Sequence, residues 1–394
     1  MSDHSYGVFD ADNHLYESPD VITTYLPREH SRDIQFVEVR GRKRISVKGR
    51  IMEYIPNPTF ERVAAPGAHV AFYSADNPEG LTMREMSGEP IDCLPGFREP
   101  APRLELMDQF GVHRTLMFPT LANLLEHALE GDPDLTHVAV HAVNQWMHDV
   151  WSFNYRDRIY AVPVITLCLL DEAIHELEWV LAEGARVILV KPAPATGYKG
   201  SRSIALSEFD PFWARVEEAG VPVCLHASFP PLTAYYDTWE PGRTENAFKS
   251  TPLRSMLVRH RDIEDTLAAM LCEGALSRFP GLKVWSVENG AIWLPSLFRE
   301  LEHLYRKMPQ EFAEHPLDVF RRNVYISPFW EDDVREVIEH VGVDHVAFGS
   351  DYPHPEGLAE PLEYFAYLDK AEVGDADQKA IMCDNGNRLL GLAP

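Results

Sequence analysis

The chain has 394 residues, and its 45% hydrophobic and 25% charged side chains supply a continuous core and speak against disorder. Acidic residues outnumber basic residues 61 to 36, and the formal net charge of -25 would repel a phosphate backbone or an anionic membrane surface. We therefore expect a small-molecule substrate and neither nucleic acid nor membrane as a partner.

The cysteines and the N-terminal segment indicate the compartment. The five cysteines are far apart and show neither paired metal-ligand spacing nor a redox CxxC motif, which favours a reducing cytoplasm. The N-terminal segment lacks a basic region followed by an apolar run, and no stretch approaches the roughly 18 to 20 apolar residues of a membrane span. We expect a cytoplasmic protein without a removed leader.

Short β-rich apolar runs alternate with longer segments of helical periodicity, which is the pattern of a parallel sheet with crossover helices. Eight such runs predict strands at residues 6–12, 113–118, 159–165, 186–191, 221–226, 282–288, 323–327 and 344–351. Helices are expected between them, for example at residues 133–155, 171–183, 263–278 and 292–307. Eight strands close a barrel, so the predicted fold is an α/β (β/α)₈ TIM barrel that forms a single domain over residues 1–394.

The first and second predicted strands are separated by residues 13–112, more than one crossover helix needs, so we expect an insertion at about residues 30–102. Within it, residues 34–47 alternate apolar and polar side chains around a glycine, which predicts a β-hairpin. The remaining stretch to Pro102 is rich in Pro and Gly and predicts a loop cap over the barrel mouth.

Side chains that can bind metal gather at the ends of four predicted strands, which is where barrel active sites are built. Strand one ends in Asp12 and His14, which stand two residues apart and project to the same side, and Glu17 follows three residues later. Strand five ends in His226 and strand six in Glu288. These positions predict ligands that approach one ion from several strands.

Strand eight ends in the run GSDYPH, which contains Asp351 and His354. A buried strand that ends in an imidazole or a carboxylate must satisfy it with a partner, and a divalent cation can collect several such groups. The candidate metal ligands are therefore Asp12, His14, Glu17, His226, Glu288, Asp351 and His354.

Each candidate also has a purely structural interpretation. The strand-end residues of strands one, five and eight can act as caps or as hydrogen-bonded core groups. Glu17 can be a solvated acid before Pro19 at a helix start, Glu288 can accept hydrogen bonds from loop amides, and His354 can simply pack between its two flanking prolines.

Together these residues resemble the amidohydrolase superfamily, in the branch that includes aminocarboxymuconate-semialdehyde decarboxylase and the resorcylate decarboxylases. The resemblance spans essentially the whole chain. It implies that Asp12 and His14 form the paired motif of strand one, that His226 is the strand-five histidine ligand, and that Asp351 binds metal or moves protons. Two departures stand out: Glu288 occupies a position where many members have a histidine, and Asp12 replaces the first of two histidines.

The resemblance implies a metal-dependent enzyme that acts on a small organic substrate by hydrolysis or non-oxidative decarboxylation. The metal would polarise a carbonyl or lower the pKa of a bound water. Asp12, His14 and His226 would hold the ion, and the candidates for proton transfer are Asp351, Glu288 and His354.

Two other functions stay open. The carboxylate-rich set exceeds the needs of one ion and suits Fe or Mn as well as Zn, so the site can hold one or two divalent ions. With Glu17 and Glu288 completing a second position, the set resembles that of the dinuclear Fe/Mn monooxygenases related to amidohydrolases. Alternatively, the chain is a non-catalytic subunit of a hetero-oligomer with a paralogue. A homo-oligomer or such a hetero-oligomer is expected, and the fold alone does not choose among these functions.

Overall fold

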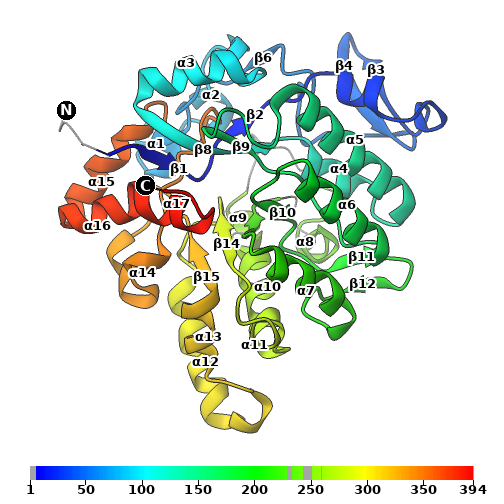
Figure 1. The fold of residues 1–394 in the computed structure, drawn as a ribbon. Helices are drawn as coiled ribbons and strands as arrows, with labels where there is room; N and C mark the ends of the chain where they lie inside the picture. Colours follow the sequence, from blue (N-terminus) through cyan, green and yellow to red (C-terminus); the bar gives the residue numbers. More distant parts are fainter. Residues whose placement is uncertain (1–5, 229–232, 243–250, 259, 394) are drawn as a thin grey trace.

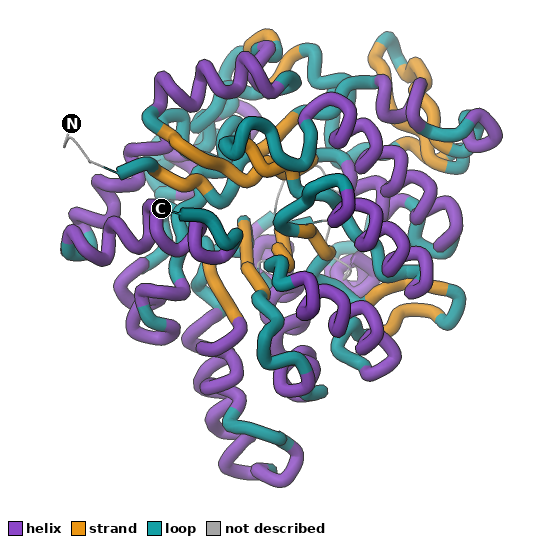
Figure 2. The backbone as a smooth tube through the Cα atoms, in the orientation of Figure 1, coloured by secondary structure: helices purple, strands orange, loops and turns teal. Residues whose placement is uncertain are grey.

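The computed structural model describes residues 6–228, 233–242, 251–258 and 260–393. Two four-stranded parallel sheets lie at its centre, and helices surround them on the outside (Figures 1 and 2). The first sheet contains β1 (Val8–Asp10), β8 (Val112–Pro119), β2 (His14–Leu15) and β9 (Ile159–Ala161). The second has the order β10 (Ile188–Val190), β13 (Val223–His226), β14 (Val284–Val287) and β15 (Val324–Ile326).

The two sheets meet at two seams, where backbone hydrogen bonds join a segment of one sheet to a segment of the other. The first seam lies after β9. The sequence predicts a strand over residues 159–165, but β9 ends at Ala161, and Pro163 has no backbone N–H to donate to a neighbouring strand. Pairing resumes beyond it, because Ile165 N donates to Leu189 O at 2.8 Å and Leu189 N donates to Pro163 O at 2.8 Å. Backbone hydrogen bonds therefore join β9 to β10 across the seam.

The other seam lies where the sequence predicts a strand over residues 344–351. A 3₁₀ turn, Val343–His345, occupies the start of this range, and no regular strand forms there. The following residues are extended: Ala347 N donates to Ile326 O of β15 at 3.0 Å, and Ala11 N donates to Phe348 O at 2.8 Å. Residues 346–348 thus bridge β15 and the end of β1.

The helices that surround the sheets are α1 (Val70–Tyr73), α2 (Met83–Met86), α3 (Pro100–Phe110), α4 (Ala122–Ala128), α5 (Pro133–Trp151), α6 (Leu170–Ala182), α7 (Asp210–Ala219), α8 (Thr233–Trp239), α9 (Pro252–Val258), α10 (Arg261–Cys272), α11 (Ala275–Arg278), α12 (Leu294–Lys307), α13 (Pro316–Asn323), α14 (Val334–Val341), α15 (Tyr364–Lys370), α16 (Asp375–Lys379) and α17 (Asn385–Leu389). The prediction of one helix over residues 263–278 is wrong, because Gly274 adopts φ 71° and separates α10 from α11. No helix in the described ranges combines the length and the apolar character that a membrane-spanning segment needs.

The inserted segment contains more regular structure than the sequence indicates. Antiparallel β3 (Ile34–Val39) and β4 (Arg42–Val47) form a hairpin, and β5 (Arg50–Ile51) extends it. The stretch predicted as a loop cap contains α1, α2 and the pair β6 (Arg62–Val63) and β7 (Ile91–Asp92). A further short hairpin, β11 (Ala195–Gly197) and β12 (Gly200–Arg202), precedes α7.

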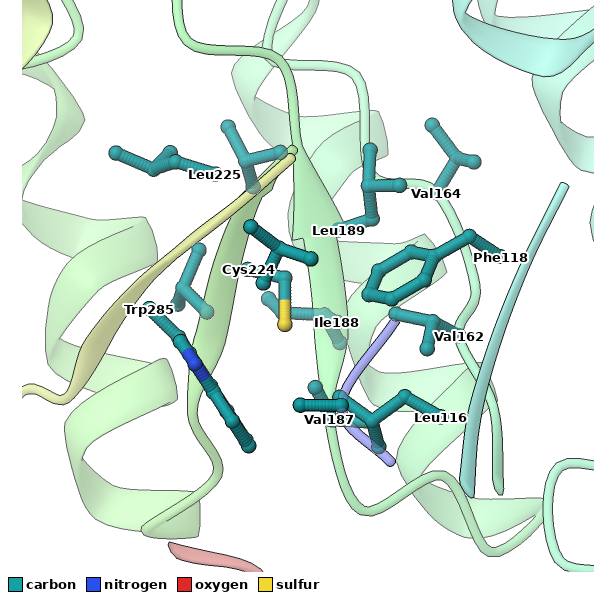
Figure 3. Packing of buried hydrophobic residues seen from close by; sticks show 14 of the residues in the cluster. Leu116, Phe118, Val162, Val164, Val187, Ile188, Leu189, Cys224, Leu225 and Trp285 are labelled. Atoms are coloured by element: carbon teal, nitrogen blue, oxygen red, sulfur yellow. The ribbon is translucent and has the colours of Figure 1, made fainter. Parts of the chain in front are cut away.

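Buried aliphatic and aromatic side chains of the strands pack against one another at the centre of the molecule (Figure 3). Leu116 on β8, Leu189 on β10 and Trp285 on β14 are each fully shielded from solvent. Burial of a side chain of this size contributes about 1.5–3 kcal/mol. The strand ends therefore project from a rigid core.

Candidate metal site

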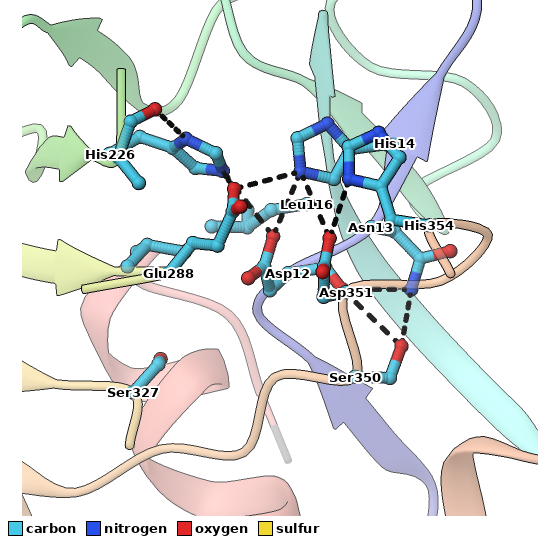
Figure 4. Close-up of polar contacts among 12 residues, drawn as sticks. Asp12, Asn13, His14, Leu116, His226, Glu288, Ser327, Ser350, Asp351 and His354 are labelled. Atoms are coloured by element: carbon cyan, nitrogen blue, oxygen red, sulfur yellow. Dashed lines mark hydrogen bonds and ion pairs between the residues drawn. The ribbon is translucent and has the colours of Figure 1, made fainter. Parts of the chain in front are cut away.

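Six of the seven candidate ligands meet at the C-terminal ends of the strands (Figure 4). Two follow β1, one ends β13, one follows β14 directly, and two follow the extended residues 346–348. They are Asp12, His14, His226, Glu288, Asp351 and His354. Strands from both sheets thus deliver side chains to one place.

Four donors converge most closely. His14 Nε2 lies 3.4 Å from Asp12 Oδ1 and 3.5 Å from Glu288 Oε2. His226 Nε2 lies 3.5 Å from Asp12 Oδ1 and 3.1 Å from Glu288 Oε2. Metal–ligand bonds of roughly 2.0–2.2 Å place neighbouring ligands of one ion about 3–3.5 Å apart. The observed spacing matches that of ligands around a single divalent ion.

Unpartnered polar atoms provide a second test of this fit. His226 Nδ1 lies 2.9 Å from Ala227 O, and a hydrogen bond there leaves the lone pair on Nε2 facing the other donors. His226 Nε2, both ring nitrogens of His14, and Asp12 Oδ1 are buried and have no hydrogen-bond partner among the described residues. A buried polar atom left unpaired costs about 1–3 kcal/mol. A divalent cation would satisfy several of these atoms at once, so the donor set fits a metal.

A second group of donors overlaps the first. It consists of His14, Glu288, Asp351 and His354. His14 Nε2 lies 3.5 Å from Asp351 Oδ1, and His354 Nδ1 lies 2.8 Å from the same oxygen. Because the two groups share His14 and Glu288, the six residues form one cluster.

Glu17 does not join this cluster. Its Oε1 accepts a hydrogen bond from Leu121 N, just before α4, at 2.6 Å. The side chain is 1% exposed, and burial raises its pKa to about 7. The sequence predicted that this carboxylate turns back toward Asp12 and His14. Instead, the chain has moved away from the end of strand one at Glu17, and the carboxylate binds the backbone just before α4. The structure places Glu17 as an acceptor for a backbone amide.

The carboxylates of the cluster shift the pKa of His14. Burial alone would lower the pKa of His14, but the Asp12 and Glu288 carboxylates outweigh it and raise this pKa to about 9. Burial acts to raise the pKa of Asp12, but the neighbouring imidazoles of His14 and His226 hold it below its ordinary value. Asp12 therefore stays anionic within the cluster.

Asp351 and His354 are shifted in opposite directions. Burial and the repulsion of Glu288 and Asp12 raise the pKa of Asp351 well above its ordinary value. Burial and the positive field of the neighbouring histidines lower the pKa of His354 well below its ordinary value. His354 Nδ1 lies within hydrogen-bond distance of Asp351 Oδ1, so a proton can pass between the two side chains.

Asp10, which the sequence interpretation missed, fixes the end of strand one. Its carboxylate accepts hydrogen bonds from Ser350 N at 2.9 Å, Ser350 Oγ at 2.6 Å and Asn13 Nδ2 at 2.6 Å. It is fully buried, and burial raises its pKa to about 7. These bonds tie the strand-one segment to the segment that carries Asp351. A carboxylate within an apolar strand end is a signal that sequence reasoning could have used.

Arg103 on α3 is a second positioning residue that sequence reasoning missed. Its guanidinium donates to Asn13 Oδ1 at 2.5 Å and to His14 O at 2.7 Å. The side chain is 1% exposed and lies over the ring of Tyr352, 5.3 Å from its centroid. No local pattern marks this arginine, because its partners are about ninety residues away in the chain.

Glu356 is the third missed residue. It follows His354 by two positions and is partly buried beside the cluster. Burial, followed by repulsion from Glu288, raises its pKa to about 7. It lines a cavity of about 930 Å³ that is also bounded by His14, His226, Glu288 and residues of the insertion. The cluster therefore opens onto a space large enough for an organic substrate.

A smaller cavity of about 80 Å³ lies beside the cluster and shares Glu288 and Glu356 with the wall of the large cavity. Asp12, Asp351, Phe329 and Trp330 contribute to its walls. Trp330 is nearly fully buried, and its Nε1 donates to Glu356 O at 3.2 Å. The two aromatic residues after β15 therefore line the small cavity beside the site.

Comparisons with known proteins show which family the chain is similar to. A family model described as Amidohydrolase matches residues 68–392. The crystal structure of an amidohydrolase from Mycobacterium avium subsp. paratuberculosis K-10 has a TM-score of 0.92 and 35% sequence identity, and the match covers 98% of this chain and 100% of that one.

Decarboxylases are among the similar proteins. The dihydroxybenzoic acid decarboxylase of Polaromonas sp. JS666, solved with bound manganese and the inhibitor 2-nitroresorcinol, has a TM-score of 0.62 at 16% identity, and the match covers 86% of this chain and 97% of that one. The 6-methylsalicylic acid decarboxylase of Penicillium expansum is 24% identical over 196 residues, which are 48% of this chain and 56% of that protein. The chain thus spans little more than half the length of the curated relatives that it matches. From the family model and the mycobacterial structure together, the chain belongs to the amidohydrolase family.

Proposed function

We propose that the protein is a metal-dependent enzyme that removes carbon dioxide from a small organic acid without an oxidant. The observation that carries this proposal is the convergence of buried, unpartnered donor atoms from Asp12, His14 and His226 beside Glu288. Decarboxylases among the similar proteins favour this reaction over hydrolysis, and the manganese of the Polaromonas enzyme favours Mn²⁺.

Asp12, His14, His226 and Glu288 would hold the ion, and imidazole with carboxylate is a donor set that Mn, Fe and Zn all accept. When bound, the metal would supply positive charge for substrate oxygens and stabilise negative charge that develops during reaction. The proposal takes one ion per chain, because His14 Nε2 is the atom that faces both donor groups and one imidazole nitrogen has a single lone pair.

The chain's own proton donor completes the reaction. Loss of carbon dioxide leaves an electron pair on carbon, and one proton must replace the carboxyl group there. Asp351 would supply that proton, because its carboxyl lies in the donor cluster within hydrogen-bond distance of His354. Asp351 would then recover a proton from solvent through His354, which lines the cavity and has Nδ1 2.8 Å from Asp351 Oδ1 and Nε2 3.3 Å from Thr120 Oγ1.

The scaffold of the proposal is a closed (β/α)₈ barrel. The parallel pairing within each sheet supports it, as do the backbone hydrogen bonds at both seams between them. A closed barrel holds the strand ends at fixed distances, which a site assembled from several strands requires.

The experiment is to load the purified chain with Mn²⁺ and supply a panel of carboxyl-labelled hydroxybenzoic acids. We expect one labelled carbon dioxide per product molecule, at the same rate with and without oxygen. Release of a hydrolysis product without carbon dioxide would favour the hydrolase, whereas consumption of oxygen with substrate would favour the dinuclear monooxygenase. If no panel acid reacts and Asp12→Ala leaves metal binding unchanged, these results would favour a non-catalytic subunit.

A further inference from the structure

Arginines are concentrated on the part of the cavity wall that the insertion supplies. In a chain with a net charge of -25, the described lining residues from the insertion include four arginines and a single acidic residue, Glu89. The arginines are Arg42, Arg44, Arg62 and Arg84. Three separate elements, β4, β6 and α2, contribute them, so the concentration does not arise from one basic run. The hairpin lies at the edge of the molecule in Figure 1.

The hairpin register selects which side chains face the cavity. Neighbouring side chains of a strand point to opposite faces, so Arg42 and Arg44 share one face of β4. Ile45 and Val47 occupy the other face and are buried in the core, which fixes this register. A slip by one residue would bury both guanidinium groups and is therefore strongly disfavoured.

Most of these arginines lack an anionic partner among the residues that the structure describes. Among the described residues, no carboxylate lies within 4 Å of Arg42, Arg44 or Arg84, whereas Arg62 Nε lies 3.6 Å from Asp92 Oδ1. Arg44 is partly buried, and its Nη1 is shielded from solvent without a hydrogen-bond partner in the described chain. A planar guanidinium with free donors is suited to bind a carboxylate or a phosphate.

The size of the cavity connects this wall to the reaction. Its volume of about 930 Å³ is near the upper end of the roughly 300–1,000 Å³ that small-molecule pockets span, far more than a single aromatic ring fills. The lining also includes Tyr16, Phe60 and Leu124, which suit an apolar middle section of a ligand. One cavity thus combines a metal-binding end, an apolar lining and a cationic wall.

We infer that the substrate of the proposed decarboxylation carries a second anionic group, a carboxylate or a phosphate, which binds Arg42, Arg44 and Arg84 at the insertion side of the cavity. The inference rests on the proposed function for the end of the substrate that reaches the metal. It assigns to the insertion the selection of elongated acids with two anionic ends over acids with one.

The test uses matched probes with one or two anionic ends, measured by calorimetry on the Mn²⁺-loaded chain. The pairs are benzoate with terephthalate, biphenyl-4-carboxylate with biphenyl-4,4′-dicarboxylate, and the corresponding terphenyl pair. The quantity compared is the Kd of the one-ended probe divided by that of the two-ended probe. We expect a ratio of at least about tenfold at one of these lengths. The reason is that charge-assisted hydrogen bonds from the arginines to the second carboxylate should strengthen binding by at least this factor over the hydrogen bonds to water that they replace. A second series replaces the second carboxylate with a phosphonate. If the phosphonate series gives the larger ratio, the subsite is selective for phosphate, and if the carboxylate series does, it is selective for carboxylate.

The double variant R44Q/R84Q should reduce this ratio to near one. Arg50→Gln is the matched control, since Arg50 is an exposed arginine of the same small sheet and lies outside the cavity lining, so the ratio should persist. A ratio near one at every length, or a ratio that survives R44Q/R84Q, would overturn the inference. Chelation of the metal should weaken the two-ended probe more than the one-ended probe, because the one-ended probe can turn its carboxylate toward the arginines, and the ratio should fall toward one. If chelation leaves both affinities unchanged, the proposed metal site fails while the ratio still reports on the arginines.

Discussion

Replacing Arg103 measures how firmly the protein holds the strand-one side of the site. The guanidinium is 1% exposed and donates to Asn13 Oδ1, His14 O and Gly96 O. Burial lowers its pKa to about 10, so it remains charged at neutral pH. Three hydrogen bonds from a charged donor, at about 1.5–3 kcal/mol each, give roughly 4.5–9 kcal/mol before the desolvation of the cation is subtracted. Arg103→Met should therefore lower the free energy of unfolding by about 3–5 kcal/mol.

The assay is urea unfolding followed by circular dichroism, with Arg158→Met as the control. Arg158 also donates to two backbone carbonyls and to Asp108, but its side chain is 22% exposed and water can replace those bonds, so we expect a loss of about 1 kcal/mol or less. Arg103→Met should also weaken Mn²⁺ binding by about tenfold or more, since it releases the backbone of His14. Equal losses of stability in the two variants, or unchanged Mn²⁺ affinity in Arg103→Met, would refute this reasoning.

Three other predictions concern separate parts of the molecule. His226→Ala and Asp12→Ala should each lower bound metal while the far-ultraviolet circular dichroism stays native, and unchanged metal in both would remove them from the site. The Nδ1 of His141 lies 2.7 Å from Glu176 Oε2, and this contact raises the pKa of His141, so its contribution to stability is complete below pH 6.5 and falls as pH rises through the raised pKa. His141→Gln should thus cost up to about 1 kcal/mol at about pH 5.5 and less at about pH 9, and a loss that is the same at both values would contradict the ion pair. Leu189→Ala should lower the free energy of unfolding by about 2–5 kcal/mol in the same urea assay, and a loss under about 1 kcal/mol would show that the core collapses around the site.

Sequence reasoning located the parts of the site that depend on strand ends. The apolar runs that became β13 and β14 end at His226 and at Val287, directly before Glu288, so a one-dimensional pattern was enough to place two donors. The amidohydrolase resemblance is confirmed by the family model. Both results rest on local patterns, because a buried parallel strand reads as a continuous apolar run.

Local backbone geometry was harder to predict. Glu288 and Asp351 both have positive φ, of 55° and 56°, and these turns end the strands at the point where the side chains enter the site. The predicted eighth strand does not form as a regular strand, and a 3₁₀ turn that follows Gly342, whose φ is 85°, occupies its start. A run of apolar residues does not reveal where such turns interrupt it.

Contacts between distant segments account for the remaining differences. Leu121, which captures the carboxylate of Glu17, is 104 residues away in the chain, and Ser350 is 340 residues from Asp10. Nothing in the neighbouring sequence encodes such pairs. The expectation of two ions depended on the number of carboxylates at the site, and Glu17 is no longer one of them. The oligomeric state and the cytoplasmic location stay predictions from the sequence.

The central claim is that one divalent ion is held by Asp12, His14, His226 and Glu288. Elemental analysis of the purified chain, after incubation with Mn²⁺ and removal of free metal, tests it most directly. We expect about one equivalent per chain in the wild type and near none in the double variant D12A/H226A, with native circular dichroism in both. Two equivalents in the wild type, or one equivalent retained by D12A/H226A, would contradict it.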